Sequence, residues 1–186
     1  MLVSDSILSL KQDALKERSC HVQFVLKIAR KLQSYYGGNS LVIDIAAILH
    51  DIWRWKELNW EHHSFAWVRI VSDFLLDYNL SKNDTDLILQ CIKNHPAFET
   101  PLTIEEKIII SADAASKLEY HSSFVLMSKK KDILSRAQWW LKYLEKGYNM
   151  IAIPEYRNSL KSTYSFYKQQ YELVISEVEW RDVWVF

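Results

Sequence analysis

Ala46-Ala47-Ile48-Leu49-His50-Asp51-Ile52 is the stretch that decides how this chain folds. A run of small and apolar residues leads into an adjacent imidazole and carboxylate. Burying these two polar groups costs free energy unless another group binds them. A divalent metal ion is the usual solution, because it accepts both types of ligand. A His-Asp pair alone is common by chance, so the metal site depends on whether other helices supply further ligands.

The composition favours one helical domain. The chain has 186 residues, of which 49% are hydrophobic and 25% are charged, as in an ordinary globular protein. With three glycines and three prolines, it has too few turn residues for an all-β fold. We therefore expect an all-α helical bundle that forms a single domain over residues 1–186.

Charge and cysteine content indicate the setting. Lys plus Arg and Asp plus Glu number 23 each, so the formal net charge is zero. This argues against an extended nucleic-acid surface, although not against a local phosphate pocket. Cys20 and Cys91 lack paired spacing, and no apolar run approaches the roughly 20 residues of a membrane span. Because the sequence starts without a signal-peptide pattern, we expect the protein to be cytoplasmic. The sequence leaves open whether it forms a homo-oligomer.

Apolar periodicity and capping residues predict the helices. Gly37-Gly38 is expected to stop a helix, Ser81 to cap one, and Thr103 with Glu106 to form a capping box. Residues 53–62, rich in tryptophan and charge, are expected to form a loop. The predicted helices cover about 4–16, 19–36, 40–52, 63–78, 84–94, 103–118, 121–148 and a long final segment from Pro154.

Several histidines fall on the predicted buried faces. His21 precedes Phe24 and Val25 by three and four residues, which places it on the apolar face of its helix. Counting back three and four residues from Ala66 and Trp67 likewise places His63 on the apolar face of its helix, whereas His62 falls outside that face. Taken singly, a histidine at such a position is more often a packed side chain than a metal ligand.

Two more polar residues continue the pattern. His95 ends a stripe that contains Ile88 and Ile92, and Pro96 follows it. Asp113 follows an apolar run and is surrounded by small residues, so a buried carboxylate there needs a cationic partner. A lysine or arginine from another helix would also serve. Together with the other inward histidines, however, Asp113 favours a metal site, and six such residues exceed what one four-coordinate ion needs.

The order His, His-Asp, His, His, Asp resembles the HD-domain superfamily of metal-dependent phosphohydrolases. The resemblance covers about residues 19–120, and the helices of about 121–186 are less diagnostic. The matching segments are His21-x3-Val25-x3-Ala29-x2-Leu32, Ala46 to Ile52, Glu61-His62-His63, Ile92-x2-His95 and Ala112-Asp113-Ala114.

The resemblance implies an all-α fold and a two-ion site. By analogy, one ion would be held by His21, His50, Asp51 and Asp113. Asp51 would bridge to a second ion held by His63 and His95. The residue types do not distinguish Mn, Fe, Ni, Co, Zn and Mg. Trp53 stands where the family often has glycine, which is expected to reshape the pocket mouth.

The implied reaction is hydrolysis of a nucleotide or another small phosphate ester. Metal ions lower the pKa of water and supply hydroxide at neutral pH. Asp51 is the expected catalytic bridge, and Arg54 is expected to contact the phosphoryl oxygens, unless it is a solvated surface charge. Two alternatives stay open: a di-iron oxygenase of the same superfamily, and a non-catalytic module that senses a nucleotide.

Overall fold

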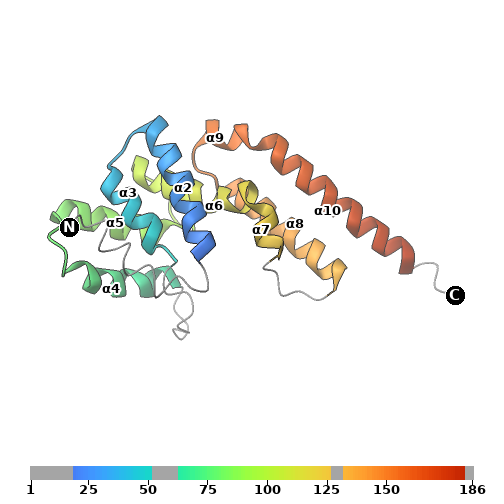
Figure 1. Cartoon of the computed structure of the whole chain (residues 1–186), viewed down its shortest axis with the longest axis horizontal. Coiled ribbons are helices and arrows are strands. Elements are labelled where there is room, and N and C mark those ends of the chain that lie inside the picture. The colour runs from blue at the N-terminus through green and yellow to red at the C-terminus, as the bar shows by residue number, and fades with distance from the viewer. Residues whose placement is uncertain (1–18, 52–62, 127–131, 183–186) are drawn as a thin grey trace. The chain divides into compact units, whose positions relative to one another are not determined.

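The structure is a computed structural model that describes residues 19–51, 63–126 and 132–182. Within these ranges, the side chains of residues 19, 63–67, 124, 126 and 179–182 are not described. All regular elements in the described ranges are helices (Figure 1), which confirms the all-α prediction. The expected helix over 4–16 and the expected loop over 53–62 lie outside the described residues.

The helices follow one another with short connections. In chain order they are α2 (Ser19–Tyr36), α3 (Ser40–Leu49), α4 (His63–Leu75), α5 (Lys82–Asn94), α6 (Ile104–Glu119), α7 (His121–Leu126), α8 (Ile133–Met150), α9 (Pro154–Ser159) and α10 (Lys161–Asp182). The chain divides into two compact units, and the division falls within α6, between Asp113 and Ala114. The single domain expected over 1–186 stays a prediction.

In the first unit, α3 lies at the centre. It packs on α2 and on α5, and α5 also packs on α4. The residues of α3 from Ile45 to Leu49 are all buried, and Ala46 and Ala47 have no exposed surface. Their small side chains let neighbouring backbones approach closely. A helix buried on nearly every side in this way delivers its last residues into the interior rather than to solvent.

The start of α3 is held at several points. Gly37 and Gly38 end α2 with φ values of +77° and +94°, a left-handed conformation that favours glycine. Asn39 then caps α3 by accepting hydrogen bonds from the Leu41 and Val42 backbones. The Asn39 backbone N–H donates to the Glu105 carboxylate at 2.8 Å. This contact ties the start of α3 to the start of α6.

The predicted caps of α5 and α6 are present. The Ser81 side chain accepts a hydrogen bond from the Asp84 N–H. At α6, the Glu106 N–H donates to Thr103 Oγ1 at 3.2 Å, and the Thr103 N–H donates to Glu106 Oε2 at 3.0 Å. These reciprocal bonds are a capping box. They fix where α6 begins, and therefore which of its residues face inward further along.

The second unit contains α8 packed along α10, with α9 beside α10. The prediction of one helix over 121–148 is wrong, because α7 ends at Leu126 and α8 begins anew at Ile133, capped by the Asp132 side chain. The prediction of one helix from Pro154 onward is also wrong. Leu160 separates α9 from α10 with φ −92° and ψ 1°, which departs from α-helical geometry.

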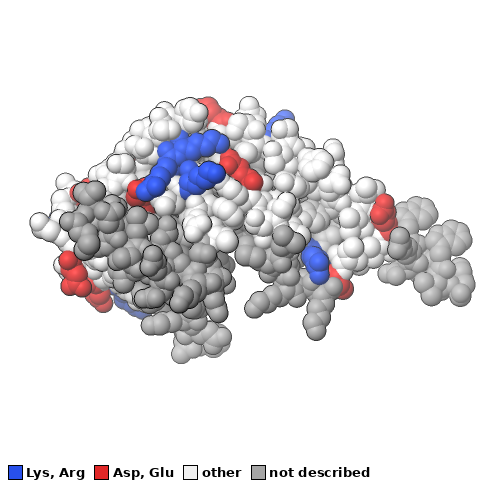
Figure 2. Space-filling model, viewed as in Figure 1, with Lys and Arg blue, Asp and Glu red and all other residues white. Residues whose placement is uncertain are grey.

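On the face drawn in Figure 2, basic and acidic side chains lie interspersed. On α2, the side chains of Lys27, Arg30 and Lys31 are exposed. Arg30 forms a forked pair with Asp44 of α3, at 2.9 and 2.7 Å, so part of this charge is balanced locally. Among the described residues, no helix combines the length and the apolar character that a membrane crossing requires.

Candidate metal centre

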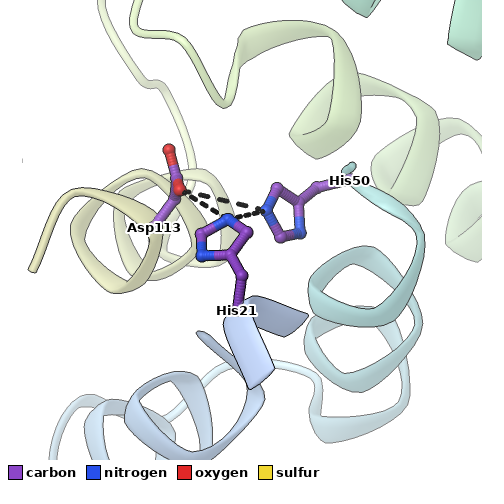
Figure 3. Close-up of side chains that lie close together, drawn as sticks. All are labelled: His21, His50 and Asp113. Atoms are coloured by element: carbon purple, nitrogen blue, oxygen red, sulfur yellow. Dashed lines mark hydrogen bonds and ion pairs between the residues drawn. The ribbon is translucent and has the colours of Figure 1, made fainter. Parts of the chain in front are cut away.

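Three side chains from separate helices meet inside the first unit (Figure 3). The His21 and His50 Nε2 atoms lie 3.2 Å apart, and His21 Nε2 lies 3.2 Å from Asp113 Oδ1. His50 Nε2 lies 3.9 Å from the same oxygen. One ligand atom from each residue therefore falls within 4.8 Å of the other two. Two nitrogens and one carboxylate oxygen face a common point.

Each of these residues reaches the cluster because of its position in its helix. His21 lies in the first turn of α2, His50 follows the last residue of α3, and Asp113 lies well inside α6. Asp113 is 7% exposed and His50 is fully buried. Helices that pack only through apolar faces do not need such groups in the interior. Their meeting is therefore a built polar centre rather than a by-product of packing.

Two more residues extend the centre. Asp51 Oδ2 lies 3.7 Å from His21 Nε2, and Asp51 Oδ1 lies 3.8 Å from His95 Nε2. The His50 and His95 rings meet edge to face, with centroids 5.3 Å apart. Asp51 thus lies between the His21 side of the centre and His95. The structure brings together five of the six residues predicted as ligands: His21, His50, Asp51, His95 and Asp113.

Two of the imidazoles are oriented by backbone carbonyls. His50 Nδ1 donates to the Ala47 carbonyl at 2.9 Å, and His95 Nδ1 donates to the Ile92 carbonyl at 2.6 Å. A carbonyl oxygen only accepts, so the hydrogen of each neutral ring is on Nδ1. Nε2 then presents a lone pair toward the centre. Metal-binding histidines are commonly fixed by this kind of second hydrogen bond.

Burial keeps both rings uncharged. For His50, burial lowers the pKa more than the nearby Asp51 and Asp113 carboxylates raise it. For His95, burial and the adjacent His50 lower the pKa to about 4. At neutral pH both Nε2 atoms are therefore unprotonated. A neutral imidazole is the form that binds a metal ion.

The spacing of the ligand atoms suits one cation. Two atoms bound about 2.1 Å from the same ion lie about 3.0 Å apart at a right angle and about 3.4 Å apart at the tetrahedral angle. The His21–His50 and His21–Asp113 separations of 3.2 Å fall in this interval, whereas the His50–Asp113 separation of 3.9 Å corresponds to a wider angle of about 135° at the ion. The donor set of imidazole nitrogens and carboxylates is also one that transition-metal ions accept. The residues present fit a metal ion.

Several predicted site residues lie outside this description. Arg54 and His62 are outside the described residues, as is Trp53 at the expected pocket mouth. His63 is the first residue of α4, but its side chain is not described. The choice between His62 and His63 therefore stays a prediction, as does the expected contact between Arg54 and substrate.

Comparison with known proteins gives a consistent result. A family model described as the HD domain matches residues 18–118, which is more than half of the chain. The crystal structure of an HD-superfamily hydrolase from Bacillus thuringiensis superposes with a TM-score of 0.66 at 20% sequence identity. The match covers 95% of this chain and 96% of that one. No curated protein matches.

Proposed function

Because this chain belongs to the HD domain family, we propose that it is a metal-dependent phosphohydrolase acting on a nucleotide or another small phosphate ester. The observation that carries the proposal is the meeting of His21, His50 and Asp113 from three separate helices. Their spacing suits a divalent cation, and burial lowers the pKa of His50 so that its ring is neutral. The Bacillus thuringiensis neighbour is described as a hydrolase, which agrees with the proposal.

Each residue of the centre has a proposed part. His21, His50 and Asp113 would hold one ion, and Asp51 would link it to a second ion held by His95 and His63. Bound divalent ions lower the pKa of water and offset charge on phosphoryl oxygens. Asp51 is 6% exposed, so its carboxylate acts where solvent screens charge weakly. Arg54 would bind the phosphoryl oxygens through its guanidinium fork.

Orientation and exclusion of water are the contributions of the protein itself. The carbonyls of Ala47 and Ile92 fix the two rings, so no reorganisation is needed when an ion binds. The apolar residues of α3 exclude water behind His50. Asp51 and Asp113 would offset only two of the four positive charges of two divalent ions, and the remaining positive charge would attract an anionic phosphate.

A hydrolysis screen tests the proposal. Chelator-treated protein is supplied with Mn, Fe, Co, Ni, Zn or Mg ions and offered nucleotides, dinucleotides, cyclic nucleotides and generic phosphate esters. We expect turnover that requires the added ion, is lost in Asp51→Ala and is kept in Asp44→Asn, a matched carboxylate on α3 that pairs with Arg30. Ion binding without turnover of any of these substrates would contradict the hydrolase function.

A further inference from the structure

A buried asparagine stands immediately before His95. Asn94 is the last residue of α5, and only 4% of its surface is exposed. A buried amide costs free energy unless its donors and its acceptor are all used. Asn94 has no place in the metal centre described above. Its partners therefore indicate what it does.

The Asn94 side chain closes the turn that follows α5. Its Oδ1 accepts a hydrogen bond from the Glu99 N–H at 2.9 Å, and its Nδ2 donates to the Glu99 carbonyl at 3.1 Å. Ala97, within this turn, has a φ of +58°, which is uncommon for a residue with a side chain. The Ala97 N–H donates to the Asn94 carbonyl at 2.8 Å. These bonds hold a strained turn in one conformation.

The second hydrogen of the amide crosses to α6. Asn94 Nδ2 donates to Glu106 Oε1 at 3.0 Å, and Glu106 is 1% exposed. Burial raises the pKa of Glu106, but hydrogen bonds from Asn94, Thr103, Leu102 and Gln90 outweigh it, so the pKa lies below its usual value. Glu106 is therefore an ionised carboxylate, and its bond with the amide is charge-assisted.

The link joins the two helices that carry parts of the centre. Glu106 and Asp113 are seven residues apart, which places them on the same side of α6, two turns apart. Asn94 is adjacent to His95, whose backbone has φ −57° and ψ −27°. The position of His95 Nε2 relative to Asp51 and Asp113 thus depends on how firmly the end of α5 is tied to α6.

We infer that Asn94 is a positioning residue: through Glu106 it fixes the end of α5, so that the His95 imidazole is held in the orientation needed to bind a metal ion. The inference rests on the proposed function for the role of His95. Its structural part, the fixed orientation of the ring, is measurable without any ion. Residues that orient a metal ligand typically change metal affinity about 10–100-fold when they are removed.

The test compares Asn94→Ala with Thr103→Ala. Both variants remove a hydrogen bond to Glu106, but only the first touches the turn next to His95. The primary readout is the ring-nitrogen NMR spectrum of the metal-free protein, with His95 assigned from a His95→Gln variant. We expect Asn94→Ala to move the His95 ring nitrogens from the Nδ1–H tautomer toward an exchange average. Thr103→Ala should leave them unchanged.

Two results would overturn the inference. One is an unchanged His95 spectrum in Asn94→Ala. The other is an equal change in both variants, because loss of any hydrogen bond to Glu106 would then explain the effect on His95 without a specific role for Asn94. If Asn94→Ala does not fold, Asn94→Ser serves the same comparison, because serine keeps a polar group in the turn but is too short to bridge to Glu106.

Manganese titration supplies the second readout. We expect Asn94→Ala to weaken, by about 10–100-fold, the binding event that is also lost in His95→Gln. In Asn94→Ala, the manganese-binding event that is lost in Asp113→Asn should keep its wild-type affinity. Failure of the wild-type protein to bind any divalent ion would refute the proposed function, whereas the NMR comparison would still decide whether Asn94 orients His95. Equal weakening of both events would contradict a role specific to His95.

Discussion

Replacing Asp113 by asparagine removes one charge from the centre while keeping the shape of the side chain. In the metal-free protein two effects oppose each other. The contact of Asp113 with His21 Nε2 at 3.2 Å is weakened, and hydrogen bonds to charged groups contribute about 1.5–3 kcal/mol. Repulsion from Asp51, which lies 3.7 Å from the same nitrogen, is relieved. Because both oxygens lie close to that nitrogen, they are at most about 7 Å apart. At an effective dielectric constant of about 20, that repulsion is at least about 2 kcal/mol.

The two effects nearly cancel. We expect the free energy of unfolding of metal-free Asp113→Asn to lie within about 1 kcal/mol of the wild-type value. The metal-bound protein behaves differently. With free metal ion at about 100 times its Kd, binding stabilises the wild type by about 2.7 kcal/mol, which raises the Tm by about 5–11 °C for a chain of this size. A hundredfold weaker Kd reduces this gain to about 0.4 kcal/mol, or about 1 °C.

The assay is thermal unfolding followed by circular dichroism, on chelator-treated protein with and without Mn²⁺. Asp44→Asn is the matched control. It also replaces an aspartate of the first unit by asparagine, but Asp44 lies on α3 and pairs with Arg30. The control should keep the full metal-dependent rise in Tm, and Asp113→Asn should lose it. A full rise in Asp113→Asn would refute its assignment as a ligand.

Three further predictions follow from other parts of the structure. Asp51→Ala should abolish metal-dependent turnover while far-UV circular dichroism keeps most of its helical signal; full activity would contradict the bridging role. Gly38→Ala should destabilise the protein in urea more than Gly37→Ala does. Both glycines have positive φ, which costs about 1–2 kcal/mol with a side chain, but an added Cβ meets neighbours at 3.1–3.2 Å only at Gly38; equal losses would contradict this packing argument. Burial lowers the pKa of His121 below 6.5, against a smaller opposing effect of its bond to the Lys117 carbonyl. The unfolded chain therefore binds more protons at this residue just below pH 6.5, so stability is lost as the pH falls through that value. His121→Gln should flatten the dependence of the unfolding free energy on pH by up to about 1.4 kcal/mol per pH unit. An unchanged slope in metal-free protein would show that His121 does not cause this pH dependence.

The parts of the fold that the sequence predicted depend on local signals. Gly37-Gly38 ends α2 because glycine adopts positive φ readily, and Thr103 with Glu106 starts α6 because its bonds close within four residues. The new helix start at Asp132 and the break at Leu160 were missed. Leu160 has neither a proline nor a glycine beside it, so nothing local marks the change of direction there.

The candidate site shows the same division. Helical spacing was enough to place His95 and Asp113 on inward faces, and both are buried in the structure. Spacing does not reveal which inward groups meet, because that depends on how separate helices pack. Asn94 was missed for this reason: its partner Glu106 lies twelve residues away on another helix, and its own position carries no ligand pattern.

Anomalous X-ray diffraction from crystals grown with Mn²⁺ tests the central claim most directly. We expect an anomalous peak about 2.0–2.3 Å from His21 Nε2, His50 Nε2 and an Asp113 carboxylate oxygen. Crystals of Asp113→Asn grown under the same conditions should lack that peak. Manganese bound elsewhere on the chain, with these three side chains free of it, would contradict the claim that the helices of the first unit converge to hold a catalytic metal ion.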